Sequence, residues 1–338
     1  MLRSFEQLRD TAKADLLIAA DEEHAALAGS GAYAMPWHWH DCLMFILPSH
    51  GTVELKHEDQ REGTWLSQDR FAVVPQNRAH ETRAGIGAHR HVAIYVTGDA
   101  RVCDVLDMRV SLDFEKIYHD PRGPYARYRR AGLLDPSEPG EEPETVVGFI
   151  AGLKKGRGDH GGVYHYASPN SDVLGLVIQG ASGRRFPDLA SERLFQPLGA
   201  RQDAYVTVDR AGTPRTGGGI NMTPRDLARL GEMMRQGGVA NGRRIVSQAW
   251  VNDTTTGGSS KAWSESTSAS WLPKGRYHNK WYQTGNGAFF ALGIHGQWLY
   301  VDPRAEMVLA KFSSQPDAIV DDAKDFNLTL FDALAKIV

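Results

Sequence analysis

Apolar and polar residues follow each other in short runs between residues 36 and 98, and this pattern predicts β-strands. The runs cover residues 43–47, 52–56, 71–75 and 91–97. Turn sequences such as His50-Gly51 separate them. Many short strands at this spacing are typical of a barrel or a sandwich, so this part of the chain is expected to form an all-β domain.

After about Arg101 the apolar residues recur every three or four positions, which predicts helices. The expected helices cover residues 124–132, 144–153, 173–181, 189–198, 223–236 and 322–336. Thr223 is a suitable N-cap before Pro224, and Gly237-Gly238 would end that helix.

Strand-like runs precede the last of these helices. They cover residues 288–294, 297–301 and 307–312. The polar stretch 254–270 is expected to be a surface loop. Helices followed by an antiparallel meander and a final helix indicate an α+β domain.

Composition and charge narrow the function classes. A chain of 338 residues with 41% hydrophobic and 23% charged residues is typical of a globular protein with room for two domains. A net charge of -3 gives no basic field, so nucleic acid is not an expected partner. Residues 1–20 hold no apolar run suited to a signal peptide or a membrane span, and Cys42 and Cys103 lack metal-ligand spacing. We expect a cytoplasmic protein without membrane contact or disulfide.

The all-β segment contains a recognisable set of residues. His38-Trp39-His40-Asp41 opens its first strand, Gly51 turns a hairpin, and residues 75–80 have the form Pro-x-x-x-x-His. In these features the segment resembles the cupin domain found at the N-terminus of AraC-type regulators. The resemblance implies a β-barrel with its histidines directed inward.

In metal-binding cupins such histidines and a glutamate hold one divalent ion. His38, His40 and His80 stand at the matching positions, while Met44 and Phe45 occupy the places where the glutamate would fall. Three histidines suffice to hold zinc, iron or nickel with open positions. The alternative is that these histidines are hydrogen-bonded at the mouth of a barrel that accepts a small organic ligand.

The second part of the chain carries a longer set of matches. Residues 164–175 read Tyr-His-Tyr-Ala-Ser-Pro-Asn-Ser-Asp-Val-Leu-Gly. Further matching segments are residues 106–108, 113–121, 195–199, 217–231 and 293–303. Together they resemble the β-lactamase-related serine hydrolases, and most of all the 6-aminohexanoate-dimer hydrolase branch, in the order of that family.

The resemblance implies roles for three residues of the first motif. Tyr166 would shuttle a proton between nucleophile and leaving group, and Ser168 would orient the substrate or a lysine. Asn170 would contact the ligand. The alternative is that Tyr166 is a core residue whose hydroxyl is tied off, as is common for a tyrosine that opens a buried helix.

His295-Gly296-Gln297 sits where the lactamases have Lys-Thr-Gly. By the same resemblance His295 would belong to a remnant catalytic site, and Gly296 and Gln297 would bind the ligand on a strand whose backbone N–H supplies half of an oxyanion hole. The resemblance implies no cofactor for this domain, and a small-molecule ligand or a short amide or ester as its partner.

The nucleophile signature of the family is absent from the printed sequence. Ser-x-x-Lys places a lysine amine beside a serine hydroxyl, but no lysine of this chain has a serine three residues before it. No Gly-x-Ser-x-Gly elbow is present either. Ser111 is excluded as a substitute because Phe114 stands at its lysine position. We therefore expect catalysis to be impaired.

The fold expected from these features is a two-module α+β chain. Residues 1–102 would form a cupin barrel with an N-terminal helical segment at residues 5–27, and residues 103–338 a truncated β-lactamase-like domain of helices and an antiparallel sheet. The cupin would replace the nucleophile lobe, leaving one sheet edge and one apolar face without their usual cover. The cupin, the segment 5–27 or a second copy in a homodimer could cover them.

Three interpretations of function stay open. The first is an impaired amide or ester hydrolase of the 6-aminohexanoate-dimer hydrolase type. The second is a cupin-based small-ligand sensor or metal-binding protein without a DNA-binding domain, because nothing after Arg101 supplies a pair of helices with a basic face. The third is a metal-dependent cupin enzyme that uses His38, His40 and His80. A deletion that joined two genes would also produce such a chain without any selected function.

Overall fold

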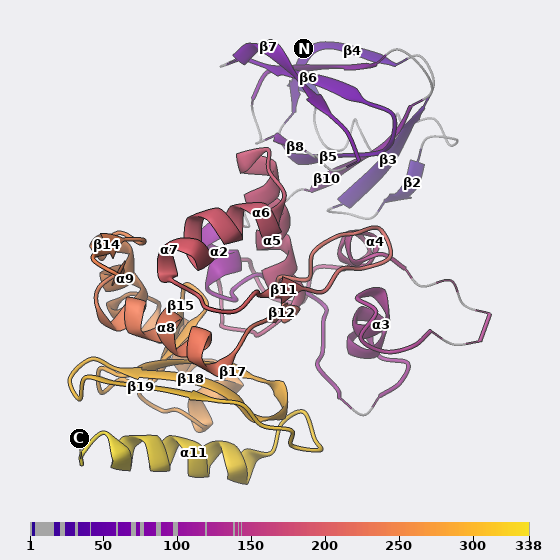
Figure 1. Cartoon of the computed structure of the whole chain (residues 1–338). Coiled ribbons are helices and arrows are strands. Elements are labelled where there is room, and N and C mark those ends of the chain that lie inside the picture. Colours follow the sequence, from indigo (N-terminus) through magenta and orange to yellow (C-terminus); the bar gives the residue numbers. More distant parts are fainter. Residues whose placement is uncertain are drawn as a thin grey trace. The chain divides into compact units, whose positions relative to one another are not determined.

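The chain forms two compact units, which are described separately (Figure 1). The first contains Met1–Asp99 and Gly175–Phe186, and the second contains Ala100–Leu174 and Pro187–Val338. The computed structural model describes residues 2–3, 17–20, 24–30, 33–40, 42–58, 60–68, 72–74, 78–85, 89–96, 101–118, 120–137, 139–140, 142 and 144–337.

Two five-stranded sheets make up the first unit. One sheet has the order β1 (Leu2–Arg3), β4 (Ala34–His40), β9 (His80–Ala84), β6 (Val53–His57) and β7 (Gln60–Leu66). The other has the order β2 (Leu17–Ala20), β3 (His24–Ser30), β10 (Arg90–Val96), β5 (Leu43–His50) and β8 (Ala72–Val74). The core of this unit gathers alternate residues of the strands, among them Met44, Ile46, Val53, Leu55 and Val74. Period-two burial of this kind is what the alternating sequence pattern predicts.

The predicted β-rich character of this unit is confirmed, but two expectations need correction. No closed barrel is seen among the described residues. The helical segment predicted at 5–27 is wrong where the structure describes it, since residues 17–20 and 24–27 are strands and residues 5–16 lie outside the described part. These residues are rich in alanine and leucine, which favour helices, but antiparallel pairing of β3 with β10 along seven residues outweighs that propensity.

The second unit is built on an antiparallel meander. Its strands in order are β15 (Arg276–His278), β16 (Trp281–Gln283), β17 (Phe289–Gly293), β18 (Gln297–Asp302) and β19 (Met307–Lys311). The last three confirm the predicted strand runs. β15 and β16 are joined by Asn279 and Lys280, both with positive φ (47° and 70°), which is the backbone of a tight two-residue hairpin turn.

Both faces of this sheet are covered by helices, as Figure 1 shows. Phe289 and Val301 pack with Met233 of α8 (Pro224–Arg235), and Phe290 and Tyr300 belong to the cluster that includes α11 (Asp321–Leu334). The expectation of an uncovered apolar face is therefore wrong. Within the described part of the chain, β19 pairs with β18 alone and is an edge strand.

The chain has further helices. They are α2 (Val102–Leu106), α3 (Pro124–Ala131), α4 (Val146–Ala151), α5 (Pro169–Ser182), α6 (Phe186–Ala190), a π-helix (Ser191–Phe195), α7 (Gln196–Leu198), α9 (Gln248–Thr256), α10 (Ser260–Ser264), and the 3₁₀ turns Thr267–Ser270 and Ile294–Gly296. Helix α5 is divided between the two units because its residues from Gly175 onward belong to the first. Two short strand pairs, β11 (Tyr205–Val206) with β12 (Ile220–Asn221) and β13 (Val239–Ala240) with β14 (Arg243–Arg244), complete the second unit. All six predicted helices are present. Among the helices that the structure describes, none has the length and apolar composition to span a bilayer.

The predicted surface loop at 254–270 is wrong. The end of α9, all of α10 and a 3₁₀ turn occupy it, and Trp263 is buried at 1% exposure. Polar residues of this stretch cap helices: the hydroxyl of Ser259 caps α10 by accepting a hydrogen bond from the Ala262 N–H. Polar residues that cap helices give the same local composition as a surface loop.

Candidate functional site

Tyr166 lies just before α5 in a cluster of aromatic side chains of the second unit. Its ring makes an edge-on contact with Tyr277 of β15, with centroids 6.1 Å apart, and Tyr164 contacts Trp263 and Tyr282. Burial raises the pKa of Tyr166 to about 12, and the neighbouring Tyr125 adds to the effect. The phenol therefore keeps its proton at neutral pH and can donate a hydrogen bond.

Lys116, which the sequence interpretation overlooked, lies against this tyrosine. Its Nζ is 4.0 Å from the centroid of the Tyr166 ring and 5.8 Å from that of Tyr125. Burial lowers the pKa of Lys116 to about 7. Along residues 114–118 exposed and less exposed residues alternate, which places Lys116 on the inner side with Phe114 and Tyr118. The sequence Phe-Glu-Lys-Ile-Tyr does not alternate in polarity, so the inner position of Lys116 follows from the fold and not from a local pattern.

A second lysine with an altered pKa approaches the start of α5. Lys280 donates from Nζ to the Val105 carbonyl oxygen at 2.7 Å and lies 3.4 Å from the Met108 sulfur. Burial lowers its pKa to about 7, although Asp107 and Asp172 act in the opposite direction. No local sequence feature indicates this, because the contacts join segments more than 170 residues apart.

The predicted ligand residues Ser168 and Asn170 are both buried beside these groups. Asn170 donates from Nδ2 to the Met108 sulfur at 3.6 Å, so Asn170 and Lys280 share one neighbour. Ser168 is 7% exposed, and its carbonyl oxygen accepts from the Ser171 N–H in the first turn of α5. The structure thus brings Asn170 close to a lysine, whereas the roles inferred for both residues stay predictions.

Asp172 fixes the first turn of α5. It accepts from the Gly217 N–H at 2.7 Å and from the Tyr128 hydroxyl, and it lies 3.6 Å from Nε of the buried Arg215. Burial raises the pKa of Asp172, while Arg215 acts against that shift. A buried carboxylate with several donors holds the helix start in place.

The turn between β17 and β18 contains His295 and Gly296, and Gln297 begins β18. Hydrogen bonds join His295 and Gln297 to residues 313–318. The His295 N–H donates to the Ala318 carbonyl oxygen at 2.9 Å, its Nδ1 lies 2.8 Å from the Gln315 oxygen, and the Gln297 side chain bonds Ser313. No hydrogen bond, ion pair or ring contact joins these residues to Tyr166 within the described part of the chain. Their predicted site role stays a prediction.

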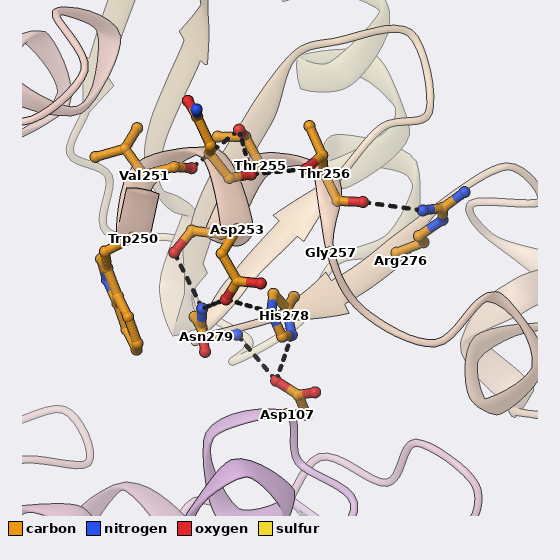
Figure 2. A network of polar contacts seen from close by, with 12 residues as sticks. Asp107, Trp250, Val251, Asp253, Thr255, Thr256, Gly257, Arg276, His278 and Asn279 are labelled. Atoms are coloured by element: carbon orange, nitrogen blue, oxygen red, sulfur yellow. Dashed lines mark hydrogen bonds and ion pairs between the residues drawn. The ribbon is translucent and has the colours of Figure 1, made fainter. Parts of the chain in front are cut away.

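A histidine held between two carboxylates is a further feature that the sequence did not indicate (Figure 2). Nε2 of His278 on β15 lies 2.9 Å from Asp253 of α9, and Nδ1 lies 2.8 Å from Asp107 after α2. The Nδ1 contact is poorly aligned, so it is an ion pair rather than a regular hydrogen bond. Asp107 first and Asp253 next raise the pKa of His278. The backbone and side-chain amides of Asn279 bond the same two carboxylates.

Three histidines converge in the first unit. His38 and His40 on β4 and His80 on β9 are buried, with one ring nitrogen of each within 4.8 Å of the others. Each Nδ1 lies 2.7–2.9 Å from a backbone carbonyl oxygen. A carbonyl can only accept, so each Nδ1 carries the proton and Nε2 is the acceptor nitrogen of each neutral ring. Burial lowers the pKa of His80 to about 3. The neighbours Asp41 and residues 75–77 of the predicted motif lie outside the described residues.

Residues 80–333 match the family model described as Beta-lactamase. This match covers more than half of the chain, so the chain belongs to the beta-lactamase family. The resemblance predicted for the second part of the chain is thereby confirmed at the level of the family.

The chain is similar to two proteins named as 6-aminohexanoate-dimer hydrolases. A 6-aminohexanoate-dimer hydrolase from Paenarthrobacter ureafaciens is 40% identical over 219 residues, which are 64% of this chain and 55% of that enzyme. A solved structure from Bacillus anthracis, provisionally named a 6-aminohexanoate-dimer hydrolase, is 25% identical with a TM-score of 0.61 and covers 70% of this chain and 61% of its own. The chain thus spans little more than half the length of these relatives.

A cupin-2 domain protein from Shewanella frigidimarina is similar to 24% of this chain and is covered over 78% of its own length. The identity is 20% and the TM-score 0.22, which is a weak likeness. The AraC-type relation expected for the first unit stays a prediction.

Proposed function

We propose that the second unit binds short amides or esters, of the kind cleaved by 6-aminohexanoate-dimer hydrolases, and that its hydrolytic activity is impaired. The observation that carries this proposal is the environment of Tyr166. The phenol is half-buried with a raised pKa, and the reactive side chain in contact with it is the amine of Lys116 rather than a serine.

A family enzyme needs a nucleophile, a base and donors for the oxyanion. In this chain Tyr166 keeps its proton and can serve as a donor to a substrate oxygen, and Asn170 can orient an amide. No serine or cysteine side chain hydrogen-bonds to Tyr166 among the described residues, so an acyl-enzyme has no evident origin. Hydrolysis would then depend on direct attack by water and would be limited to activated esters.

Two measurements on the full chain test this proposal. The first is binding of linear 6-aminohexanoate dimer by calorimetry; we expect saturable binding that Asn170→Ala weakens. The second is hydrolysis of 4-nitrophenyl acetate; we expect slow turnover without acylation of a serine, reduced by Tyr166→Phe. Tyr205→Phe is the matched control, because Tyr205 is 68% exposed on β11.

The two parts of the proposal, substrate binding and impaired hydrolysis, can be refuted separately. A burst of nitrophenol together with a covalent acyl group on a serine, found by peptide mass spectrometry, would overturn the impairment. Absence of dimer binding to a folded sample would overturn the substrate class.

The histidine cluster supports a second candidate function, for the first unit. We propose that His38, His40 and His80 bind a divalent transition metal. The three anchored Nδ1 atoms fit this role, because their protons are held by backbone oxygens and one ring nitrogen of each histidine lies within 4.8 Å of the others. The ion would supply a Lewis acid with open coordination positions.

Cobalt titration followed by visible absorption, with metal analysis of the purified chain, tests the site. We expect about one equivalent per chain, lost in His80→Ala and kept in the exposed-site control His50→Ala. Binding well below one equivalent, or equal binding in both variants, would remove this function.

A further inference from the structure

Lys116 differs from the other lysines of the second unit in what surrounds its amine. Lys280 donates to the Val105 oxygen, and Lys324 pairs with Asp321 at 2.6 Å. Lys116 has no hydrogen-bond or ion-pair partner among the described residues, and its Nζ rests on the face of the Tyr166 ring. An amine without a counter-charge in an aromatic setting is a feature that the proposed hydrolysis does not use.

The side chain of Lys116 is half-buried, so part of it faces solvent. The Lys116 amine is next to aromatic rings. Its Nζ lies over the Tyr166 ring and 5.8 Å from the centroid of the Tyr125 ring, which in turn contacts the Tyr118 ring. Arg129 lies over the Tyr125 ring at 5.9 Å and adds a second positive charge nearby. These aromatic neighbours favour contact with an apolar, uncharged molecule.

We propose that the Lys116 amine is a nucleophile that condenses with small uncharged aldehydes or ketones seated against the Tyr166 and Tyr125 rings. Only a neutral amine attacks a carbonyl, and burial lowers the pKa of Lys116 to about 7, so about half of the molecules carry it at neutral pH. The Tyr166 ring would favour the ammonium form, but the loss of solvation outweighs this attraction.

The chemistry balances without a further reactant. The Nζ lone pair forms a bond to the carbonyl carbon and a carbinolamine results. The carbonyl oxygen then leaves as water with the two hydrogens of the amine, and a C=N bond remains. Tyr166 keeps its proton at neutral pH, so it can donate a hydrogen bond while the oxygen departs.

Competition among lysines in one sample tests the proposal. The folded natural chain is treated with benzaldehyde and cyanoborohydride, which reduces the imine to a stable benzylamine, and labelling of each lysine is followed by peptide mass spectrometry. At pH 7 we expect Lys116 to be labelled at least about ten-fold faster than Lys261 and Lys336, whose side chains are 84% and 73% exposed. The rate at Lys116 should level off above pH 7, whereas theirs should keep rising.

Lys280 is the matched control, because burial lowers its pKa to about 7 as well while its amine is engaged with Val105 and Met108. It should react more slowly than Lys116. Urea should equalise all lysines, and Lys116→Arg should remove the fast label alone. Labelling of Lys116 at the rate of Lys261 in the folded chain would overturn the proposal. The readout is independent of the proposed hydrolysis, because ester turnover plays no part in it.

Discussion

The contact of His278 with two carboxylates gives a prediction about stability. His278→Ala leaves Asp107, which is 6% exposed, with the Asn279 N–H at 3.0 Å as its remaining described donor. Removing a charged partner from a buried group costs about 1.5–3 kcal/mol. The side chain of Asp253 is 56% exposed, so its loss is screened and adds only about 0.2–1 kcal/mol. We expect His278→Ala to destabilise the second unit by about 3 kcal/mol.

The effect should depend on pH with a definite sign. The pKa of His278 is raised above its unfolded value near 6.5, so the stabilisation is fully present below that pH and is lost as pH rises through the folded value. The natural chain should therefore lose stability on going above about pH 6.5. His278→Ala should lack this slope, and His278→Gln should restore some stability without restoring the slope.

Hydrogen exchange resolved by peptides is the suitable assay, because a chain of two units need not unfold in one step. Peptides from α9 and from residues 276–283 should exchange faster in His278→Ala at pH 6. Exchange in the first unit is the internal reference. Equal protection of these peptides in both chains, or the same pH slope in both, would refute the reasoning.

Three further predictions concern other parts of the chain. Burial lowers the pKa of His91 to about 4, so this histidine alone should cost the first unit about 3 kcal/mol as pH falls from 6.5 towards 4, a loss that His91→Gln removes and that exchange or circular dichroism measures. Trp263→Ala should cost about 3–5 kcal/mol in urea unfolding, because the ring is 1% exposed, whereas Trp250→Ala, at 43% exposure, should cost less than about 1 kcal/mol. Gly231→Ala should destabilise the second unit by about 1–3 kcal/mol and lower its melting temperature, because the added Cβ would lie 2.7 Å from the Val308 side chain of β19. An unchanged melting temperature would contradict the packing of α8.

Local signals predicted local structure well. Thr223 and Pro224 indicated the start of α8, and in the structure the Thr223 hydroxyl accepts from the Asp226 N–H at 3.1 Å. The alternating runs indicated β5, β6 and β10 for the same reason, because side-chain period is set within a few residues. Around Ser259 several capping residues stand close together, and their polar composition is the same as that of a surface loop. The pattern there predicted a loop, whereas the structure has helix α10.

The site depends on contacts that a linear pattern does not contain. The segment around Tyr166 was found because it is a contiguous motif. Lys280, Asp107 and His278 meet only after α2, α5 and the β15–β16 hairpin have packed, and their pKa values follow from that burial. The inner position of Lys116 is also absent from the linear pattern, because Glu115 and Lys116 stand side by side and only the structure shows which of them is covered.

The open side of β19 has a consequence for handling the protein. Its residues, Met307–Lys311, are apolar up to the final lysine, and one edge of the strand has no paired strand among the described residues. Such an edge accepts any extended peptide of matching length, including the same strand of a neighbouring molecule. A charged residue introduced at Ala310 would act as a gatekeeper there, keeping concentrated samples monodisperse without touching the aromatic cluster or the histidines.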